Sequence, residues 1–202
     1  MTESERKQII ALIQREVIPA IGCTEPIAVA LCVAKATETL GAKPEKIKVL
    51  LSANILKNAM GVGIPGTGMI GLPIAVALGA LIGKSDYQLE VLKDSTPEAV
   101  EEGKKLIDEK RICISLKEDI TEKLYIEVTC EAGGEQATAI ISGGHTTFVY
   151  VAKGDEVLLN KQQTSGEEEE EETLELTLRK VYDFALTAPL DEIRFILETA
   201  RL

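Results

Sequence analysis

The stretch IGCTEP at residues 21–26, followed by the apolar run IAVALCVA at residues 27–34, decides how the rest of the chain is interpreted. The Thr24 hydroxyl can accept a hydrogen bond from an unpaired backbone N–H, so Thr24 is the predicted N-cap of a helix. Pro26 fits the first turn, where a missing N–H costs nothing. Residues 27–34 carry no polar face, which predicts a helix that is buried on all sides.

This arrangement puts Cys23 just ahead of a helix N-terminus. The partial positive charge there favours a thiolate over a thiol, so the sequence indicates a reactive cysteine with a lowered pKa. Glu25 lies close enough in sequence to exchange protons with a substrate. The alternative stays open that Cys23 is a small core hydrophobe and that Glu25 only complements the helix dipole.

Composition limits the class of protein. The chain has 202 residues, which is enough for one large domain or two small ones. Hydrophobic residues make up 45% and aromatic residues 3%, and the chain has no tryptophan, so the core is expected to be aliphatic. The formal net charge of −11 argues against nucleic acid and anionic membranes as partners. Six consecutive glutamates at residues 167–172 contribute part of that charge, and we interpret them as a solvated linker.

The four cysteines are Cys23, Cys32, Cys113 and Cys130, and their spacing matches neither C-x-x-C nor a zinc site. The charged N-terminus MTESERK leads into an amphipathic helix and does not resemble a signal peptide. The longest apolar runs are short for a membrane span. We therefore expect a cytoplasmic protein with reduced thiols and no membrane partner.

Periodicity predicts the elements. A helix starts with a capping box of Thr2 and Glu5 and ends before Pro19, and a second helix covers residues 26–40. Further helices are expected at residues 72–81, 86–93, about 95–110 with a capping box of Ser95 and Glu98, and 174–202 with an interruption at Ala188-Pro189. Strands are expected at residues 47–53, 111–116, 124–130, 136–142 and 147–152, with a hairpin turn at residues 133–134.

These elements predict an α+β fold. Residues 1–42 form the first helices of a helical domain, residues 43–165 an inserted α+β domain with a mostly antiparallel sheet, and residues 166–202 an acidic linker that returns to the helical domain. The helical domain is therefore expected to be discontinuous in sequence.

The loop GVGIPG at residues 61–66 matches G-x-G-x-x-G, but we do not interpret it as a dinucleotide site. It contains a proline, does not directly follow a strand, and is not followed by the expected acidic residue. Its glycines indicate a backbone that closely approaches another chain segment or a small ligand. Asn54, Lys57 and Asn58 just upstream are candidates for binding a carboxylate and an amine, or they form a solvated helix face.

The stretch SGGHT at residues 142–146 is the second candidate for ligand binding. Gly143 and Gly144 let backbone N–H groups face a ligand, and they precede His145, the single histidine. Together with Thr146 they form a candidate substrate site in which His145 acts as acid, base or anion donor. The alternative is that His145 only hydrogen-bonds across a hairpin.

Three motifs resemble the L-cysteine desulfidase family, which is related to iron–sulfur L-serine dehydratases. They are IGCTEPIAVAL at residues 21–31, ANILKNAMGVGIPGTGMIGLPIA at residues 53–75 and SGGHT at residues 142–146. The resemblance covers about residues 9–150. It implies that a [4Fe-4S] cluster helps to eliminate sulfide from L-cysteine, giving pyruvate and ammonia, and that Cys23 is the base.

The resemblance also limits what this chain does alone. Family members are roughly twice as long, and their cluster-ligating cysteines lie in the C-terminal half. We therefore expect no metal ligand in this chain and no activity without the remaining half. By the same resemblance, Asn54, Lys57, Asn58 and the turn at residues 143–146 are candidates for holding the amino acid.

Three alternatives remain. The substrate is L-serine in place of L-cysteine, since only the leaving atom differs. The α+β domain is an amino-acid sensing module, like the regulatory domain of serine dehydratases. The chain is a structural subunit that pairs with a separate catalytic chain. Association into a homodimer through exposed apolar faces is a further hypothesis.

Overall fold

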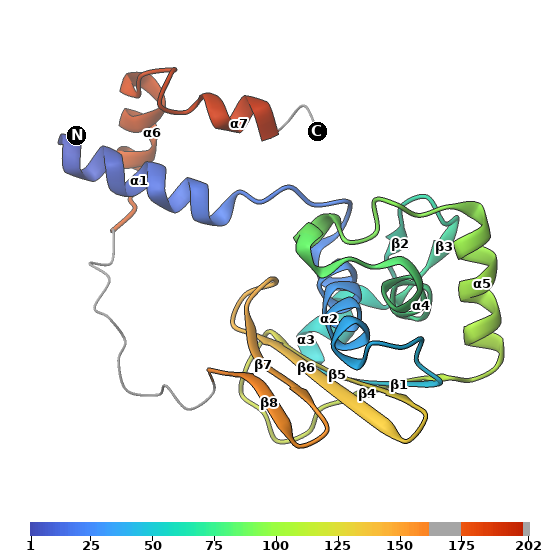
Figure 1. Ribbon diagram of the computed structural model, residues 1–202. Coiled ribbons are helices and arrows are strands. Elements are labelled where there is room, and N and C mark those ends of the chain that lie inside the picture. Colours follow the sequence, from blue (N-terminus) through green and yellow to red (C-terminus); the bar gives the residue numbers. More distant parts are fainter. Residues whose placement is uncertain (162–174, 200–202) are drawn as a thin grey trace. The chain divides into compact units, whose positions relative to one another are not determined.

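A computed structural model describes residues 1–161 and 175–199, and it divides the chain into two compact units (Figure 1). One unit comprises Ala20–Thr164, and the other joins Met1–Pro19 to Ser165–Leu202. Helices and a mixed sheet together make an α+β fold, as the sequence predicts. The acidic run at residues 167–172 lies outside the described residues.

The larger unit contains a six-stranded sheet with the order β4-β1-β5-β6-β7-β8. Only the β1–β4 pair is parallel, so the sheet is mostly antiparallel as predicted. Gly133 and Gly134 both have positive φ angles and form the predicted tight turn between β5 and β6. The strands are β1 (Lys46–Leu51), β4 (Ile112–Leu116), β5 (Tyr125–Ala132), β6 (Glu135–Ser142), β7 (Phe148–Lys153) and β8 (Glu156–Asn160).

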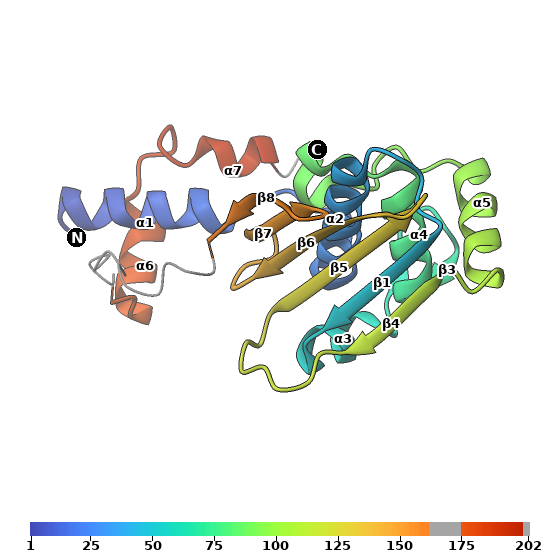
Figure 2. The same cartoon turned by 60° about the horizontal axis from the view of Figure 1, so that its bottom comes forward.

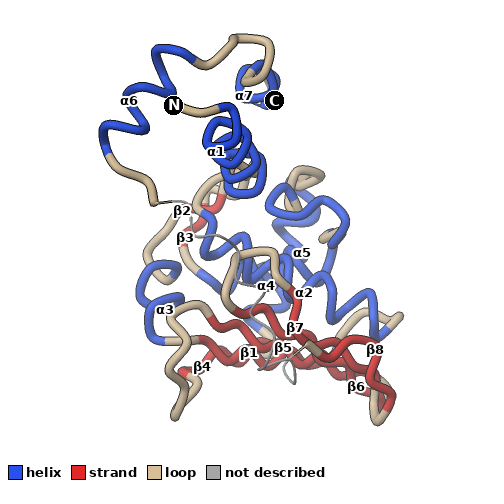
Figure 3. The backbone as a smooth tube through the Cα atoms, turned by 90° about the vertical axis from the view of Figure 1, so that its left-hand side faces the viewer, coloured by secondary structure: helices blue, strands red, loops and turns tan. Residues whose placement is uncertain are grey.

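Helices cover one face of this sheet (Figure 3). Helix α2 packs on β5 and β6, α4 packs beside α2, and α5 packs beside α4. The side chains of residues 27–34 are fully buried, which confirms the predicted all-round burial of this helix. The helical elements of the unit are α2 (Thr24–Leu40), α3 (Ala53–Ala59), α4 (Leu72–Ile82), η1 (Ser85–Glu90) and α5 (Pro97–Asp108).

Small residues let α2 and α4 approach closely. A Cβ atom added at Gly79 would lie 2.6 Å from the carbonyl oxygen of Ala30, so only glycine fits at this crossing. The buried side chains around the crossing are aliphatic, as the lack of tryptophan and the few aromatic residues predict. Close packing of this kind makes the core sensitive to a single added methyl group.

The domain boundary predicted at residues 42 and 43 differs from the structure, where it lies between residues 19 and 20. Helix α2 belongs with the sheet, and α1 (Glu3–Glu16) belongs to the other unit. The physical reason is the composition of α2. A helix without a polar face needs cover on every side, and the sheet, α4 and η1 supply it.

The smaller unit joins the two ends of the chain. It contains α1, α6 (Leu178–Thr187) and α7 (Arg194–Thr199). Thr2 and Glu5 form the predicted capping box at the start of α1. The ion pair between Arg6 and Glu192 is 2.9 Å long and connects α1 to the segment before α7.

Two details of the predicted helices are wrong. Thr96, not Ser95, caps α5, because its hydroxyl accepts a hydrogen bond from the Ala99 N–H. The segment predicted as a helix at residues 86–93 is a 3₁₀ turn, which Gln88 interrupts with φ 52° and ψ −128°. Among the described residues, no helix is both long enough and apolar enough to cross a membrane.

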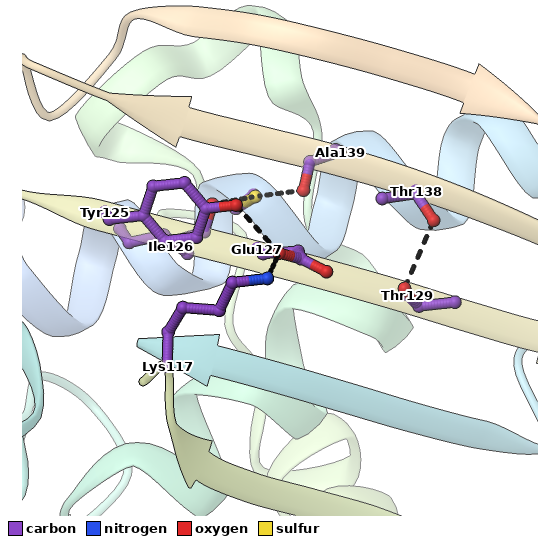
Figure 4. A network of polar contacts seen from close by, with 8 residues as sticks. Lys117, Tyr125, Ile126, Glu127, Thr129, Thr138 and Ala139 are labelled. Atoms are coloured by element: carbon purple, nitrogen blue, oxygen red, sulfur yellow. Dashed lines mark hydrogen bonds and ion pairs between the residues drawn. The ribbon is translucent and has the colours of Figure 1, made fainter. Parts of the chain in front are cut away.

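The other face of the sheet carries a polar network (Figure 4). Glu127 accepts hydrogen bonds from Lys117 Nζ and from the Tyr125 hydroxyl, each 2.7 Å long. Thr129 and Thr138 are cross-strand partners, with hydroxyl oxygens 3.1 Å apart. Burial and then the bond to Glu127 raise the pKa of Tyr125 well above its usual value, so the phenol stays a hydrogen-bond donor.

Candidate functional site

The turn before α2 is held by two other segments of the same unit. The Ile21 N–H donates a 3.0 Å hydrogen bond to the Leu89 carbonyl of η1. Gly22 has φ +96°, and a Cβ atom added there would lie only 2.8 Å from Pro65 Cγ. These contacts fix the path of the backbone that presents Cys23, so the position of the thiol depends on segments far away in sequence.

Helix α2 starts at Thr24, two residues before the predicted start at residue 26. Cys23 is the N-cap and Thr24 the first helical residue, and the Cys23 side chain makes no capping hydrogen bond. The Thr24 hydroxyl instead donates to Glu25 Oε2 at 3.2 Å. The prediction of Thr24 as the N-cap is therefore wrong, because its hydroxyl is engaged by the neighbouring carboxylate.

Three candidate residues meet at this helix start. The Cys23 thiol donates to Glu25 Oε2 at 3.0 Å, and Asn58 Nδ2 of α3 donates to Glu25 Oε1 at 3.3 Å. Both Cys23 and Glu25 are half-buried. Helix α3 reaches the site because it lies beside α2 at the end of β1, as Figure 2 shows. The Glu25 carboxylate is therefore held from both sides, with Asn58 on Oε1 and both Cys23 and Thr24 on Oε2.

The thiolate expected for Cys23 is not what this geometry favours. The hydrogen bond to Glu25 raises the pKa of Cys23 above its ordinary value, and burial adds to the effect. Backbone N–H groups at the helix start lower it, but less. The same hydrogen bond is the largest cause of the lowered pKa of Glu25. At neutral pH the shared proton therefore resides on Cys23 Sγ, and the expected lowering of the Cys23 pKa is wrong.

The glycine-rich loop forms a small hairpin of β2 (Gly63–Ile64) and β3 (Met69–Ile70). Of the two occupants predicted for its close approach, the structure identifies another chain segment, since Pro65 of this loop lies against Gly22. Gly71 repeats the pattern with φ +90°, because an added Cβ atom would lie 2.8 Å from the Met60 carbonyl oxygen.

The other polar residues of α3 do not join this group. Asn54 is exposed and lines a shallow surface hollow together with residues 116–123. Lys57 is exposed on the same short helix. Of the three α3 residues predicted to bind a substrate, only Asn58 contacts another candidate residue, and its contact is with Glu25.

The turn with His145 lies at the end of the sheet where α2 begins. The Cys32 thiol donates to the Ala139 carbonyl at 3.3 Å, and the Thr37 hydroxyl lies 3.6 Å from the sulfur of Cys130, the partner of Ala137. Helix α2 therefore runs away from the end of β6, and its start lies beyond that end. The Gly143 N–H donates to the Leu124 carbonyl at that same end. His145 is half-buried, and within residues 1–161 and 175–199 no hydrogen bond or ion pair joins it to Cys23.

The rest of that turn is held by its own backbone. The Ser142 N–H donates to the Thr147 carbonyl and the Thr147 N–H to the Gly144 carbonyl. Gly143 has φ +79°, which the turn requires and which glycine adopts without strain. Thr146 is half-buried within the turn. The roles of Gly143, Gly144, His145 and Thr146 in binding stay predictions.

The cysteines do not form a ligand set for a metal cluster. Cys32 and Cys130 are buried in the core, whereas Cys113 is exposed on β4. Burial raises the pKa of Cys32 and raises that of Cys130 to about 11, which opposes the thiolate form that a metal needs. In the part of the chain that the structure describes, no three His, Cys, Asp or Glu side chains gather to hold a metal ion. These residues therefore do not fit a [4Fe-4S] cluster by themselves.

Sequence reasoning missed two contributors to the site. Pro65 was noted only as an obstacle to a dinucleotide site, although a proline among glycines already suggests a fixed loop that packs on something. Leu89 contributes only its carbonyl oxygen, and the sequence carries no signal for such a contact.

The fold and the site define an α+β chain with a thiol–carboxylate pair at the start of a buried helix. The chain is similar to proteins named UPF0597. It is 81% identical to that of Bacteroides thetaiotaomicron over all 202 residues, 76% to that of Phocaeicola vulgatus and 49% to that of Porphyromonas gingivalis. In these three comparisons it covers 47%, 47% and 48% of the relative, so the chain spans about half the length of the curated relatives it matches. No family model and no solved structure matches the chain.

Proposed function

We propose that this chain supplies the proton-transfer part of an iron–sulfur-dependent lyase that eliminates sulfide from L-cysteine to give pyruvate and ammonia. The observation that carries the proposal is the 3.0 Å hydrogen bond from the Cys23 thiol to Glu25 Oε2 at the start of a buried helix. A thiol and a carboxylate within hydrogen-bond reach are a standard pair for moving a proton. The resemblance of the three motifs to L-cysteine desulfidases supplies the reaction.

The reaction needs a base for the α-proton of the amino acid. As that proton leaves, the Cβ–S bond breaks with its electron pair on sulfur, and 2-aminoacrylate remains. Tautomerisation to the imine and addition of one water then give pyruvate and ammonia. For Cys23 to accept the α-proton, its own proton must first leave the sulfur. Glu25 Oε2 is the acceptor in place for it, so the two residues act as a relay.

A [4Fe-4S] cluster in the complete enzyme would act as a Lewis acid on the leaving group. The described residues of this chain provide no ligand set for it, so the proposal assigns its ligands to the part of the relatives that this chain does not cover.

The amino acid is the proposed partner, with Lys57 and the turn at residues 143–146 as candidates for its carboxylate. Lys57 carries the needed positive charge, and the turn lies at the end of the sheet where α2 begins. We also propose a cytoplasmic location, since all four cysteines are free and free thiols persist in reducing compartments.

Homodimerisation is also a proposal. Leu178 and Leu186 of α6 are 91% and 68% exposed, and apolar side chains of this kind favour association with another helix. Sedimentation of this chain as a monomer at high concentration would contradict it.

The test uses the full-length protein that carries this chain, with its cluster reconstituted without oxygen. Sulfide and pyruvate release from L-cysteine and from L-serine are compared in the wild type, Cys23→Ser and Cys113→Ser. We expect Cys23→Ser to lose at least about 100-fold in kcat, the usual contribution of a proton-transfer group, and Cys113→Ser to keep full activity. Cys113 is a matched control because it is an exposed free cysteine of the same unit.

Three outcomes contradict the proposal. Full activity in Cys23→Ser removes Cys23 from the chemistry. Turnover of L-serine without L-cysteine identifies a serine dehydratase. Saturable binding of an amino acid without turnover of either substrate identifies a sensing module.

A further inference from the structure

Asn58 stands out because its contact differs from its predicted role. An asparagine that binds a substrate carboxylate would keep its amide free, but Asn58 Nδ2 donates to Glu25 Oε1 at 3.3 Å. The two residues are 33 positions apart in sequence, so the contact depends on the packing of α3 against α2. The contact therefore bears on the orientation of Glu25 in the Cys23–Glu25 pair.

The geometry assigns one carboxylate oxygen to each side of the site. Glu25 Oε1 receives Asn58, and Oε2 receives both the Cys23 thiol and the Thr24 hydroxyl. A carboxylate is planar, so holding Oε1 toward α3 directs Oε2 toward the thiol. Without the Asn58 amide, Glu25 is free to rotate away from Cys23, because its side chain is only half-buried.

Helix α3 is firmly enough anchored to do this. Its N-cap Ser52 is 2% exposed and accepts a hydrogen bond from the Ile55 N–H. The Ser52 hydroxyl also donates to the Lys123 carbonyl at 2.8 Å, which ties the helix start to the loop before β5. Ile55 is buried in the core. Asn58 therefore projects from a helix whose position is fixed by the fold.

We propose that Asn58 is a positioning residue, which orients the Glu25 carboxylate so that it holds the proton of Cys23 and is ready to receive it. The inference rests on the proposed role of Cys23 and Glu25 as a proton relay. It changes the predicted role of Asn58, which acts through Glu25 and does not bind the substrate.

The charges around the pair are few. The groups that shift the pKa of Cys23 or Glu25 are these two residues themselves, Thr24 and Asn58. The elements packed against α2 carry further ionisable side chains, and none of these is among the groups that shift either pKa. They are Lys57 on α3, Asp86, Tyr87 and Glu90 on η1, Tyr125, Glu127, Cys130 and Glu131 on β5, Glu135 on β6, and Tyr150 and Lys153 on β7. A change in the reactivity of Cys23 after substitution of Asn58 therefore reports on Glu25.

The experiment measures the rate of Cys23 alkylation by iodoacetamide between pH 6 and pH 10, on this chain, with mass spectrometry to locate the label. The background carries Cys113→Ser, because Cys113 is the other cysteine with exposed surface. The variants are Glu25→Gln, Asn58→Ala, their combination, and Asn54→Ala as the matched control. Asn54 is an exposed asparagine one turn earlier on the same helix.

Removing the carboxylate in Glu25→Gln removes the largest cause that holds the proton on Cys23. We expect alkylation below the pKa to become about tenfold faster. Asn58→Ala should accelerate it in the same direction by about threefold. Because Asn58 acts through Glu25, the double variant should match Glu25→Gln, and Asn54→Ala should match the background.

An unchanged profile in Asn58→Ala would overturn the inference, and so would an additive effect in the double variant, since either shows that Asn58 does not act through Glu25. A raised KM for the amino acid with an unchanged alkylation profile would return Asn58 to the predicted substrate site. The measurement requires no turnover. Failure of sulfide release would therefore contradict the proposed function alone, and the alkylation profiles would still decide the role of Asn58.

Discussion

The substitution Gly22→Ala tests whether the turn before α2 is fixed by the contact with Pro65. Gly22 has φ +96°, a conformation that costs a residue with a side chain about 1–2 kcal/mol. The new Cβ atom would lie 2.8 Å from Pro65 Cγ and 3.1 Å from Cδ, and relieving such a clash costs about 1–3 kcal/mol. Alanine also restricts the backbone of the unfolded chain, and this raises the free energy of unfolding by about 0.4–1 kcal/mol. We expect a net loss of about 1–4.6 kcal/mol.

The control is Gly63→Ala in the hairpin that contains Pro65. A Cβ atom added at Gly63 meets nothing within 4 Å, and the residue has no positive φ angle. This control should therefore change the free energy of unfolding by less than about 1 kcal/mol. The two variants share the type of substitution and differ in the contact with Pro65 and in the positive φ angle of Gly22.

Urea unfolding followed by circular dichroism measures both variants against the wild type. A second readout is alkylation of Cys23, which should change in Gly22→Ala because the turn that carries the thiol moves. If Gly22→Ala is no less stable than Gly63→Ala, the contact with Pro65 does not fix the turn, and the argument that the glycine-rich loop supports the site is refuted.

Three further predictions concern the core and the sheet. Gly79→Ala should lower the free energy of unfolding by about 1–3 kcal/mol in urea, because its Cβ atom would lie 2.6 Å from the Ala30 carbonyl oxygen. Burial raises the pKa of Cys130 to about 11 from 9.0, so the unfolded chain loses this proton first. Stability should fall by up to roughly 2–3 kcal/mol as pH rises from 9 to 11, and urea titrations of Cys130→Ala should show a weaker fall. Glu127→Gln should cost about 1–2 kcal/mol by the same assay, since the Tyr125 hydroxyl and a lysine lose their charged acceptor.

Much of the fold could be predicted because its signals are local. The apolar run at residues 27–34 predicts a fully buried helix, and Gly41 ends it with φ +77° as a left-handed cap. Gly133 and Gly134 predict the hairpin between β5 and β6. The domain boundary could not be predicted in the same way, because α1 and α2 are both helices and the sequence does not say which helix packs on the sheet.

The edge strand β8 (Glu156–Asn160) was missed for a related reason. Val157 and Leu158 are both exposed, so the segment lacks the clean alternation that identifies a half-buried strand. Its turn contains Gly154 with φ +54°, a signal that the sequence offered. Pairing with β7 determines this strand, and pairing is a tertiary property.

The protonation state of Cys23 shows most clearly where sequence reasoning stops. Position ahead of a helix lowers a thiol pKa, and that effect can be predicted from sequence. The opposing effect comes from the direction in which the Glu25 carboxylate points, and Asn58, 33 residues further along the chain, holds its second oxygen. A carboxylate 3.0 Å from the sulfur outweighs the backbone N–H groups, so the tertiary contact reverses the local one.

The fold positions both the sulfur of Cys23 and its proton. The thiol is presented by a turn that Leu89 and Pro65 fix, and its proton is held by a carboxylate that α3 orients. Each support comes from a different element, so a shift of any one of them changes either the position of the sulfur or the place of its proton. A thiol that stays protonated beside Glu25 is not permanently a reactive thiolate. Transfer of its proton to Glu25 is the single step that turns it into a base. We infer that the close packing of the glycine-rich loop and of α3 against the start of α2 keeps Cys23 in position for this proton transfer and also stabilises the fold.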